Sequence, residues 1–224
     1  MFPDASVHIE GVAYNPKDGA FYMGSVNTGS VYRLIGGALD TIALPGDAPR
    51  WSVLGLAVDS VRQLLYLTRC CLAESADTSL KGASDLLCYD LQHKRWAGRY
   101  EMRQQGRIIN FNDLAFDRDG CVYIADSGRP GGLWLLDARI KKLRAMPLKG
   151  VRLPQGLVYT DSVLYVADYA RGMAAFRFSD SSTRRIGIAR PEGARYFYDG
   201  VQSYKGGFVA VCNGPNKGIL RIDP

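Results

Sequence analysis

The chain has 224 residues, of which 47% are hydrophobic, and its formal net charge is +6. This length allows a sizeable core in one domain spanning residues 1–224, and no apolar run of about 18 residues is present to predict a membrane span. The densest basic run, residues 139–144, follows a predicted strand and is better explained as a solvated turn than as a nucleic-acid surface.

Short apolar runs recur along the chain, separated by turns rich in Gly, Asp and Lys. The first run of each repeat begins at one of the equivalent positions Glu10, Leu54, Asp113, Gln155 and Asp199. Second runs cover residues 21–25, 65–68, 122–126, 164–168 and 208–212, and third runs cover 30–34, 86–90, 132–137, 172–176 and 218–223. The runs are short and rich in β-branched and aromatic residues, so they predict strands rather than helices.

A spacing of roughly 40 to 50 residues with several strands per repeat is typical of propeller blades. The sequence therefore predicts an all-β propeller with five visible blades, the last of which stops after its third strand. Either these five blades close imperfectly, since residues 1–6 are too short for a closing strand, or a sixth blade is absent from this chain.

The second repeat contains a long insertion, residues 69–84, between its second and third strands. In an up-and-down blade this connection emerges on the same face as the start of the first strand. We therefore expect the insertion to overhang the polar positions as a candidate lid. The adjacent pair Cys70 and Cys71 follows its first residue, Arg69, and is either buried or redox-active.

Polar side chains occupy the start of the first strand in four repeats, with Asn112 beside Asp113. Oxygen donors converging from several blades suit a hard divalent cation, Ca²⁺ above all, with Mg²⁺, Mn²⁺ or Zn²⁺ as alternatives. Such a cation and a neighbouring carboxylate would serve hydrolysis of a lactone or ester. The alternative is that these groups form ordinary caps and hydrogen bonds at strand ends.

Two arginines, Arg129 and Arg171, lie in loops that follow second strands and are candidates for binding a substrate carboxylate, although surface arginines are common. The partner predicted by this equipment is a small lactone or ester. Residues 1–4 lack the basic and apolar order of a secretory signal, which predicts a cytoplasmic protein, or a periplasmic or secreted one if the natural N-terminus is missing.

Several of these motifs resemble the blade motifs of one known family. They are Glu-Gly-Val-Ala at residues 10–13, Phe-Asn-Asp-Leu-Ala-Phe-Asp at 111–117, Pro-Gln-Gly-Leu at 154–157 and Asp-Gly-Val at 199–201. They are similar to those of the regucalcin (senescence marker protein), gluconolactonase and luciferin-regenerating-enzyme family. The resemblance implies a six-bladed propeller, and hence a sixth blade beyond the five seen here.

The resemblance also implies a metal ion held by a Glu, an Asn and an Asp, with the Asp acting as base. Glu10 and Asp199 match the Glu and the Asp, and Gln155 stands in place of the metal-binding Asn. Asn112 matches an Asn that contacts substrate and water, and Asn110 replaces an Arg frequent in sugar-lactone members. The predicted function is metal-dependent hydrolysis of a lactone or ester, and the alternative is a catalytically inactive binding or scaffold propeller.

Overall fold

A computed structural model of the chain describes residues 7–146, 148–169, 171–188, 192–193 and 195–223. The chain divides into two compact units, Met1–Asn112 and Asp113–Pro224. The boundary falls inside the strand Phe111–Phe116. Residues 1–6, which were expected to be too short to close a ring, lie outside the described part of the chain.

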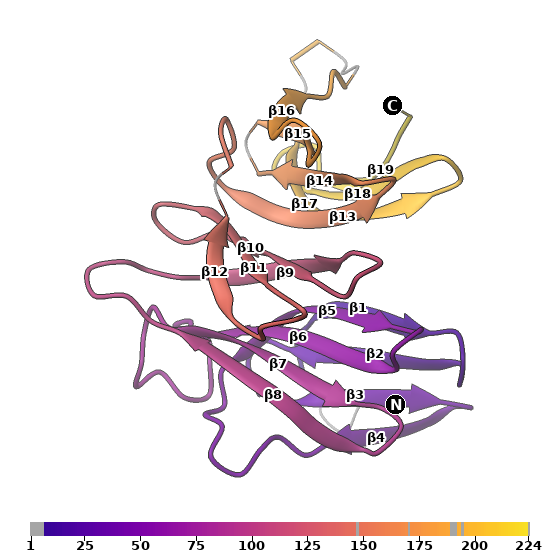
Figure 1. Ribbon diagram of the computed structural model, residues 1–224, viewed down its shortest axis with the longest axis vertical. Coiled ribbons are helices and arrows are strands. Elements are labelled where there is room, and N and C mark those ends of the chain that lie inside the picture. Colours follow the sequence, from indigo (N-terminus) through magenta and orange to yellow (C-terminus); the bar gives the residue numbers. More distant parts are fainter. Residues whose placement is uncertain (1–6, 147, 170, 189–191, 194, 224) are drawn as a thin grey trace. The chain divides into compact units, whose positions relative to one another are not determined.

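The first unit contains two antiparallel sheets of four strands each, ordered as the chain runs (Figure 1). The first sheet consists of β1 (Ile9–Asn15), β2 (Ala20–Ser25), β3 (Val31–Ile35) and β4 (Ala38–Ile42). The second consists of β5 (Ser52–Asp59), β6 (Leu64–Cys70), β7 (Ser84–Asp90) and β8 (Arg95–Met102).

Three further sheets follow, and the last has three strands in the described residues. The third sheet consists of β9 (Phe111–Phe116), β10 (Val122–Asp126), β11 (Gly132–Leu136) and β12 (Leu143–Met146). The fourth consists of β13 (Pro154–Thr160), β14 (Val163–Asp168), β15 (Gly172–Arg177) and β16 (Ser182–Arg185). The fifth consists of β17 (Phe197–Tyr204), β18 (Gly207–Asn213) and β19 (Gly218–Ile222).

These sheets confirm the prediction of an all-β chain with five propeller blades and a shorter last blade. The expectation of a six-bladed type is not supported, because each of the five sequence repeats forms one sheet and the described residues contain no sixth. The sixth blade had been inferred from the size of a similar family, whereas the five came from the apolar pattern of the chain itself.

Apolar side chains of neighbouring sheets form the cores. In the first unit Ala20, Val31, Val53, Leu65 and Leu67 are fully buried in one cluster drawn from both sheets. The second unit has equivalent clusters, one between the third and fourth sheets of the chain and one between the fourth and fifth. Strands inside the stack of sheets are buried on both faces, as in β10, in which all five residues are buried, and this is what the short continuous apolar runs predict.

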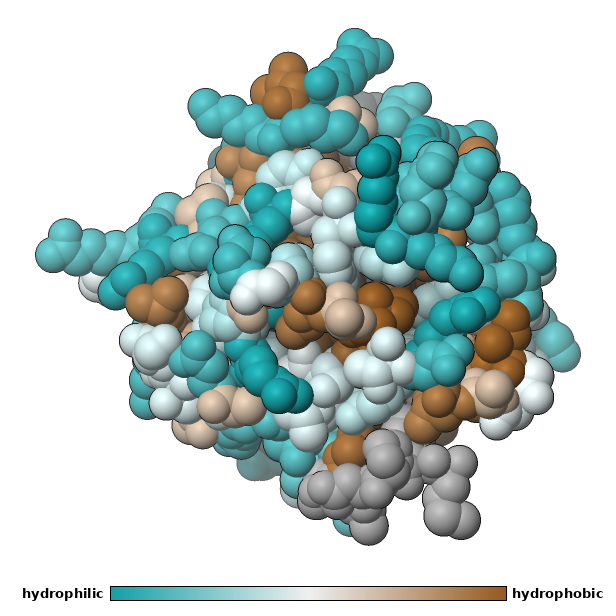
Figure 2. All heavy atoms as spheres, turned by 90° about the horizontal axis from the view of Figure 1, so that it is seen from below, coloured by the Kyte–Doolittle hydropathy of each residue, from teal (hydrophilic) through white to brown (hydrophobic). Residues whose placement is uncertain are grey.

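Apolar side chains also reach the surface on the first and last sheets. Val12, Tyr14 and Phe21 are exposed on the first sheet, and Val211 and Ile219 on the last. Figure 2 shows one face of the molecule, on which separate apolar patches lie among hydrophilic side chains. None of the described residues forms a helix long and apolar enough to pass through a membrane.

A β-bulge is repeated in the first strand of four sheets. The pairing register shifts between Ile9 and Val12, Val53 and Leu56, Pro154 and Leu157, and Tyr198 and Val201. The bulged pairs are therefore Glu10-Gly11, Leu54-Gly55, Gln155-Gly156 and Asp199-Gly200. Bulges bend a strand and re-aim its side chains. Glu10, Gln155 and Asp199, three of the predicted polar positions, are each the first residue of such a bulge.

The third sheet shifts the predicted alignment by one residue. Buried Phe111 and Leu114 flank two half-buried residues, Asn112 and Asp113, as buried Tyr198 and Val201 flank the bulged pair in β17. Asn112 therefore corresponds to Asp199, and Asp113 takes the place that Gly occupies in the other repeats. The polar character of both residues had hidden this offset.

The insertion in the second sheet is anchored at its base. The Ser75 hydroxyl accepts hydrogen bonds from the backbone nitrogens of Ser52 and Leu72, at 3.1 and 2.9 Å. Cys71 and Ala83 form a small apolar cluster with Trp51, and Cys71 N donates to Ala83 O at 2.9 Å. The insertion thus lies against the start of β5 as a hydrogen-bonded loop, and its role as a lid stays a prediction.

Candidate functional site

Two of the predicted metal ligands, Gln155 and Asp199, lie on adjacent inner strands of the second unit. A Cβ atom at Gly156 would lie 2.5 Å from the Asp199 carbonyl oxygen and 2.7 Å from the Val201 nitrogen. Only glycine allows β13 and β17 to approach so closely. Gln155 and Asp199 therefore occupy equivalent bulge positions on backbones that are in contact.

The Asp199 carboxylate is held by a side chain of the next strand. Asn213 Nδ2 donates to Asp199 Oδ2 at 2.7 Å. Burial raises the pKa of Asp199, while the Asn213 hydrogen bond lowers it. A half-buried carboxylate with a raised pKa accepts protons more readily than a solvated one, which suits a general base. The sequence alone gave Asn213 no role at this position.

Asp113 joins two inner strands of the same unit. Its Oδ2 accepts a hydrogen bond from Leu157 N at 2.9 Å, and its Oδ1 accepts one from Leu114 N at 2.8 Å. Burial, and to a smaller extent the negative charge of Asp199, raise the pKa of Asp113 to about 7, against the effect of both hydrogen bonds. Asp113, predicted to bind substrate, thus has backbone partners at both of its carboxylate oxygens.

Glu10 and Asn112 belong to the first unit, and Gln155 and Asp199 to the second. Glu10 is exposed on β1, and Gly11 beside it lies so close to the Leu54 carbonyl that a Cβ atom would collide with it. The Asn112 carbonyl accepts a hydrogen bond from the Thr68 hydroxyl, which also accepts one from Gly55 N at 2.8 Å. Thr68 thus connects a bulge of the second sheet to β9.

The two predicted arginines differ in their surroundings. Arg129 is exposed and lines a pocket of about 460 Å³ with Arg152 and Leu153, immediately before β13. Arg171 is also exposed, but does not line this pocket. Two arginines lining one pocket give it a positive charge that would attract a carboxylate or phosphate of a ligand. Sequence reasoning missed Arg152, although it stands three residues before Gln155.

A buried carboxylate fixes the segment that carries Arg152. Asp168, at the end of β14, is 1% exposed, and its Oδ2 accepts hydrogen bonds from Arg185 Nη2 at 2.7 Å and from Arg152 N at 3.1 Å. Removing a buried carboxylate from water is unfavourable unless it is paired. The pair therefore orders the backbone next to the 460 Å³ pocket.

The donors available for a metal ion are carboxylate and amide oxygens. Among the described residues, His, Cys, Asp and Glu side chains do not gather in any group of three that would hold an ion by themselves. A site built on Asp199 would therefore draw on the amide oxygen of Gln155 as well. Ca²⁺ accepts such mixed oxygen ligands.

No protein-family model matches the sequence, and no curated protein matches it. Solved structures do match. A chain of a nidogen/laminin complex is 18% identical with a TM-score of 0.72, covering 97% of this chain and 76% of that chain. A protein of unknown function from Bacteroides caccae is 13% identical with a TM-score of 0.68, covering 98% and 79%.

A gluconolactonase from Xanthomonas campestris is 19% identical with a TM-score of 0.66, covering 99% of this chain and 77% of that chain. At such identities the likeness establishes the propeller fold alone. It agrees with the gluconolactonase-like fold that the blade motifs predict, while the neighbours themselves include an enzyme and a member of a protein complex.

Proposed function

We propose that the chain is a metal-dependent hydrolase of a lactone or ester, similar in kind to a gluconolactonase. The observation that supports this best is the placement of Gln155 and Asp199 at equivalent bulges of two touching inner strands. The gluconolactonase among the structural neighbours has the same fold and supports the same class of substrate.

In this proposal Gln155 and Asp199 of the second unit bind a divalent cation, with Ca²⁺ as the first candidate, and Glu10 remains a third ligand predicted by the blade motifs. The cation would supply Lewis acidity toward the carbonyl oxygen of the substrate. Asp199 accepts a proton from the attacking water, because its burial favours the protonated form. Asn112 orients substrate or water.

The arginines complete the proposal. Arg129 and Arg152 line the same pocket, so they bind a negatively charged substituent of the substrate beside β13. Arg171 does not line that pocket, so the argument that it binds the substrate is weaker. Asp113, which has backbone partners at both oxygens, contributes through the position of Leu157.

Metal binding and turnover test this together. After dialysis against Ca²⁺, Mn²⁺ or Zn²⁺, elemental analysis of the full chain should give one ion per molecule, and a panel of lactones and esters should show metal-dependent hydrolysis. Asp199→Asn should lose both properties. Asp119→Asn, a change of the same kind at an exposed turn, should keep both. Absence of bound metal in the wild-type chain would refute the proposal.

A binding propeller without catalysis is the second candidate. Gln155 favours it, since its amide lies one bond farther from the backbone than that of the Asn it replaces, and so does the neighbour from the nidogen/laminin complex. This candidate predicts that wild type and Asp199→Ala hydrolyse every lactone in the panel at the same background rate.

A further inference from the structure

A pocket of about 310 Å³ lies within the first unit, where the outer part of the first sheet meets the second sheet. Its polar lining includes Asp18, Arg33 and Asp40, and its apolar lining includes Tyr89, Leu91 and Trp96. The volume is at the lower end of the range for small-molecule pockets. None of these residues belongs to the site proposed for hydrolysis.

The position equivalent to this pocket in the second unit is closed. Comparing the two positions shows which side chains leave the pocket open. In the first sheet Tyr22 pairs with Arg33, and Arg33 with Asp40. In the third sheet Tyr123 pairs with Leu135, and Leu135 with Arg144. An Asp in the preceding turn accepts a hydrogen bond from the tyrosine in both sheets, at 3.4 Å from Tyr22 and 2.9 Å from Tyr123. Arg33 therefore stands where the third sheet has buried Leu135.

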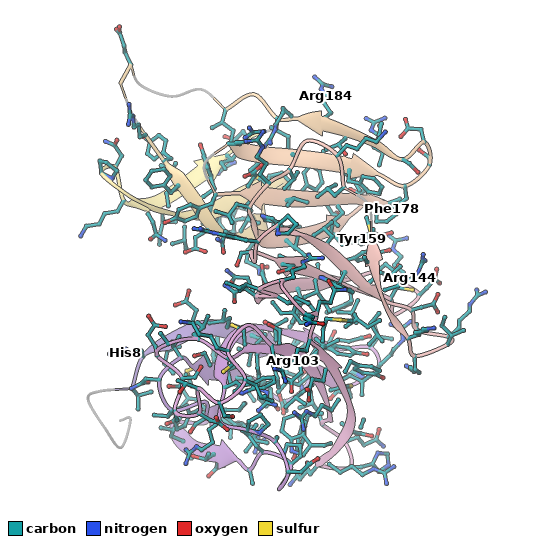
Figure 3. All side chains as sticks on the ribbon, turned by 90° about the vertical axis from the view of Figure 1, so that its left-hand side faces the viewer. His8, Arg103, Arg144, Tyr159, Phe178 and Arg184 are labelled. Carbon is teal, nitrogen blue, oxygen red and sulfur yellow. The ribbon has the colours of Figure 1, made fainter. Side chains whose placement is uncertain are left out.

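The opposite wall shows the complementary difference. Leu65 pairs with Tyr89 in the second sheet, as Leu164 pairs with Phe176 in the fourth. Two residues further on, the second sheet has Leu91 and the fourth has Phe178. The Phe178 ring lies 5.2 Å from the ring of Tyr123 and 5.9 Å from that of Tyr159, which Figure 3 shows beside it.

In the second unit, aromatic rings thus occupy the space that is open as a pocket in the first unit. Val58 takes the place of Tyr159, because Val58 pairs with Leu65 as Tyr159 pairs with Leu164. Val58 and Leu91 are both smaller than the residues they replace. Together with Arg33 in place of Leu135, these side chains distinguish the open position from the closed one, so the cavity is not a general property of the blades.

The Arg33 guanidinium is close to both carboxylates of the pocket without being hydrogen-bonded to them, whereas Asp18 accepts hydrogen bonds from Ala20 N and from the Tyr22 hydroxyl. Arg33 is 3.8 Å from Asp18 Oδ2 and 3.9 Å from Asp40 Oδ2, beyond the usual hydrogen-bond distance. A guanidinium has five donors and each carboxylate has four acceptor sites. This group therefore retains capacity for hydrogen bonds with a ligand that carries both donors and acceptors.

The charges of the pocket select against an ion. Two cationic side chains, Arg33 and Lys94, line it together with two anionic ones, Asp18 and Asp40. Because Arg33 lies within 4 Å of both carboxylates and Lys94 lines the same pocket, the fields of these charges largely cancel for a ligand with a net charge. Hydroxyl groups, which donate to a carboxylate and accept from a guanidinium, fit this arrangement better.

The aromatic wall is rigid. Trp96 Nε1 donates to Ala43 O at 2.8 Å, and the Trp96 and Tyr89 rings meet edge to face with centroids 4.9 Å apart. A fixed aromatic surface provides a flat apolar platform at small entropic cost. We propose that this pocket binds a neutral, polyhydroxylated ring of monosaccharide size, with its hydroxyls on Arg33, Asp18 and Asp40 and one face on Trp96.

Methyl α-D-glucopyranoside, methyl α-D-galactopyranoside and methyl α-D-mannopyranoside are suitable probes, since none of them is a lactone or ester. Saturation-transfer NMR and tryptophan fluorescence on the full chain should show saturable binding of at least one. Arg33→Leu and Leu91→Phe, which copy the closed position of the second unit, should each weaken binding about tenfold or more. Phe178→Leu, the reverse change at that closed position, should leave the affinity unchanged.

Thermal unfolding and circular dichroism of each variant establish that it is folded, and Arg33→Lys provides a milder change should a larger one unfold the chain. The proposal is overturned if the wild type binds none of the three glycosides, or if Leu91→Phe or Arg33→Leu binds as the wild type does. It is equally overturned if Asp199→Asn abolishes binding while Leu91→Phe preserves it, because the glycoside then occupies the other site.

Discussion

The carboxylate of Asp113 on β9 accepts a hydrogen bond from Leu157 N at the bulge of β13, with 2.9 Å between Oδ2 and nitrogen. One side chain thus ties the inner strands of two successive sheets. The same carboxylate has a pKa of about 7, raised above its ordinary value of 3.8 mainly by burial. The link therefore titrates near neutral pH.

The first prediction concerns the pH dependence of stability. Because the folded-state pKa of Asp113 is raised, its contribution to stability is complete below about pH 4 and decreases as the pH rises toward about 7. In Asp113→Asn this part of the pH slope should disappear, together with a pH-independent loss from one missing acceptor. Urea unfolding at pH 4, 5.5, 7 and 8 measures both effects. An unchanged slope in the variant would contradict the prediction.

The second prediction concerns the approach of β13 to β17. Gly156→Ala places a Cβ atom 2.5 Å from a backbone oxygen, so the strands must move apart. We expect a loss of about 1–3 kcal/mol in the free energy of unfolding, as for other overpacked positions. Gly187→Ala is the control, since no atom lies within 4 Å of a Cβ atom there. Equal stabilities of the two variants would argue against close contact.

The third prediction concerns a fully buried ion pair in the second sheet. Arg69 donates to Asp85 through Nε at 2.9 Å and Nη2 at 2.6 Å, both side chains are 0% exposed, and Arg99 Nε donates to the same carboxylate at 2.9 Å. Arg69→Met should lower the free energy of unfolding by about 3–5 kcal/mol, because it leaves Asp85 buried with fewer partners.

The exposed pair Arg221 and Asp223 provides the comparison for this measurement. Its side chains are 54% and 70% exposed, so Arg221→Met should cost less than about 1 kcal/mol. If chemical denaturation gave similar losses for Arg69→Met and Arg221→Met, burial would not be the property that makes the Arg69 pair important.

The fourth prediction concerns the insertion of the second sheet. Ser75 Oγ accepts two backbone N–H groups and lies 3.2 Å from the Cys70 carbonyl oxygen, to which it donates. Ser75→Ala removes these bonds and should accelerate hydrogen exchange of residues 71–83, with a global loss of about 1–2 kcal/mol. Ser79→Ala, in the same loop, should have less effect on exchange. Fast exchange of the whole loop in the wild type would show that it is not anchored.

The repeat could be predicted from the sequence because the apolar runs, and the Gly- and Asp-rich turns between them, recur at a similar spacing along the chain. The strand over residues 122–126 was predicted with the bounds of β10, and others differ by one or two residues. The sixth blade was expected from a family resemblance and not from the repeats themselves, and the described residues form five sheets.

The site was readable only in part. The starts of the first apolar runs suggested a common position for Glu10, Gln155 and Asp199. Nothing in the sequence distinguishes a bulge from an ordinary strand, so Asp113 was aligned in place of Asn112. Arg152 and Arg185 act through contacts with Asp168 that depend on folding. The pocket at Arg33 was missed because it arises from small residues, Val58 and Leu91, which look like ordinary core.

The bulge occurs with Glu10, Leu54, Gln155 or Asp199 as its first residue, so its geometry is indifferent to the chemistry of that side chain. The conformation of the bulge therefore does not depend on whether its first side chain can bind a ligand. In such a scaffold, selection could exchange acidic, amide and aliphatic side chains at the first residue of each bulge without changing the fold. A combinatorial library at these residues should therefore yield folded chains of altered specificity.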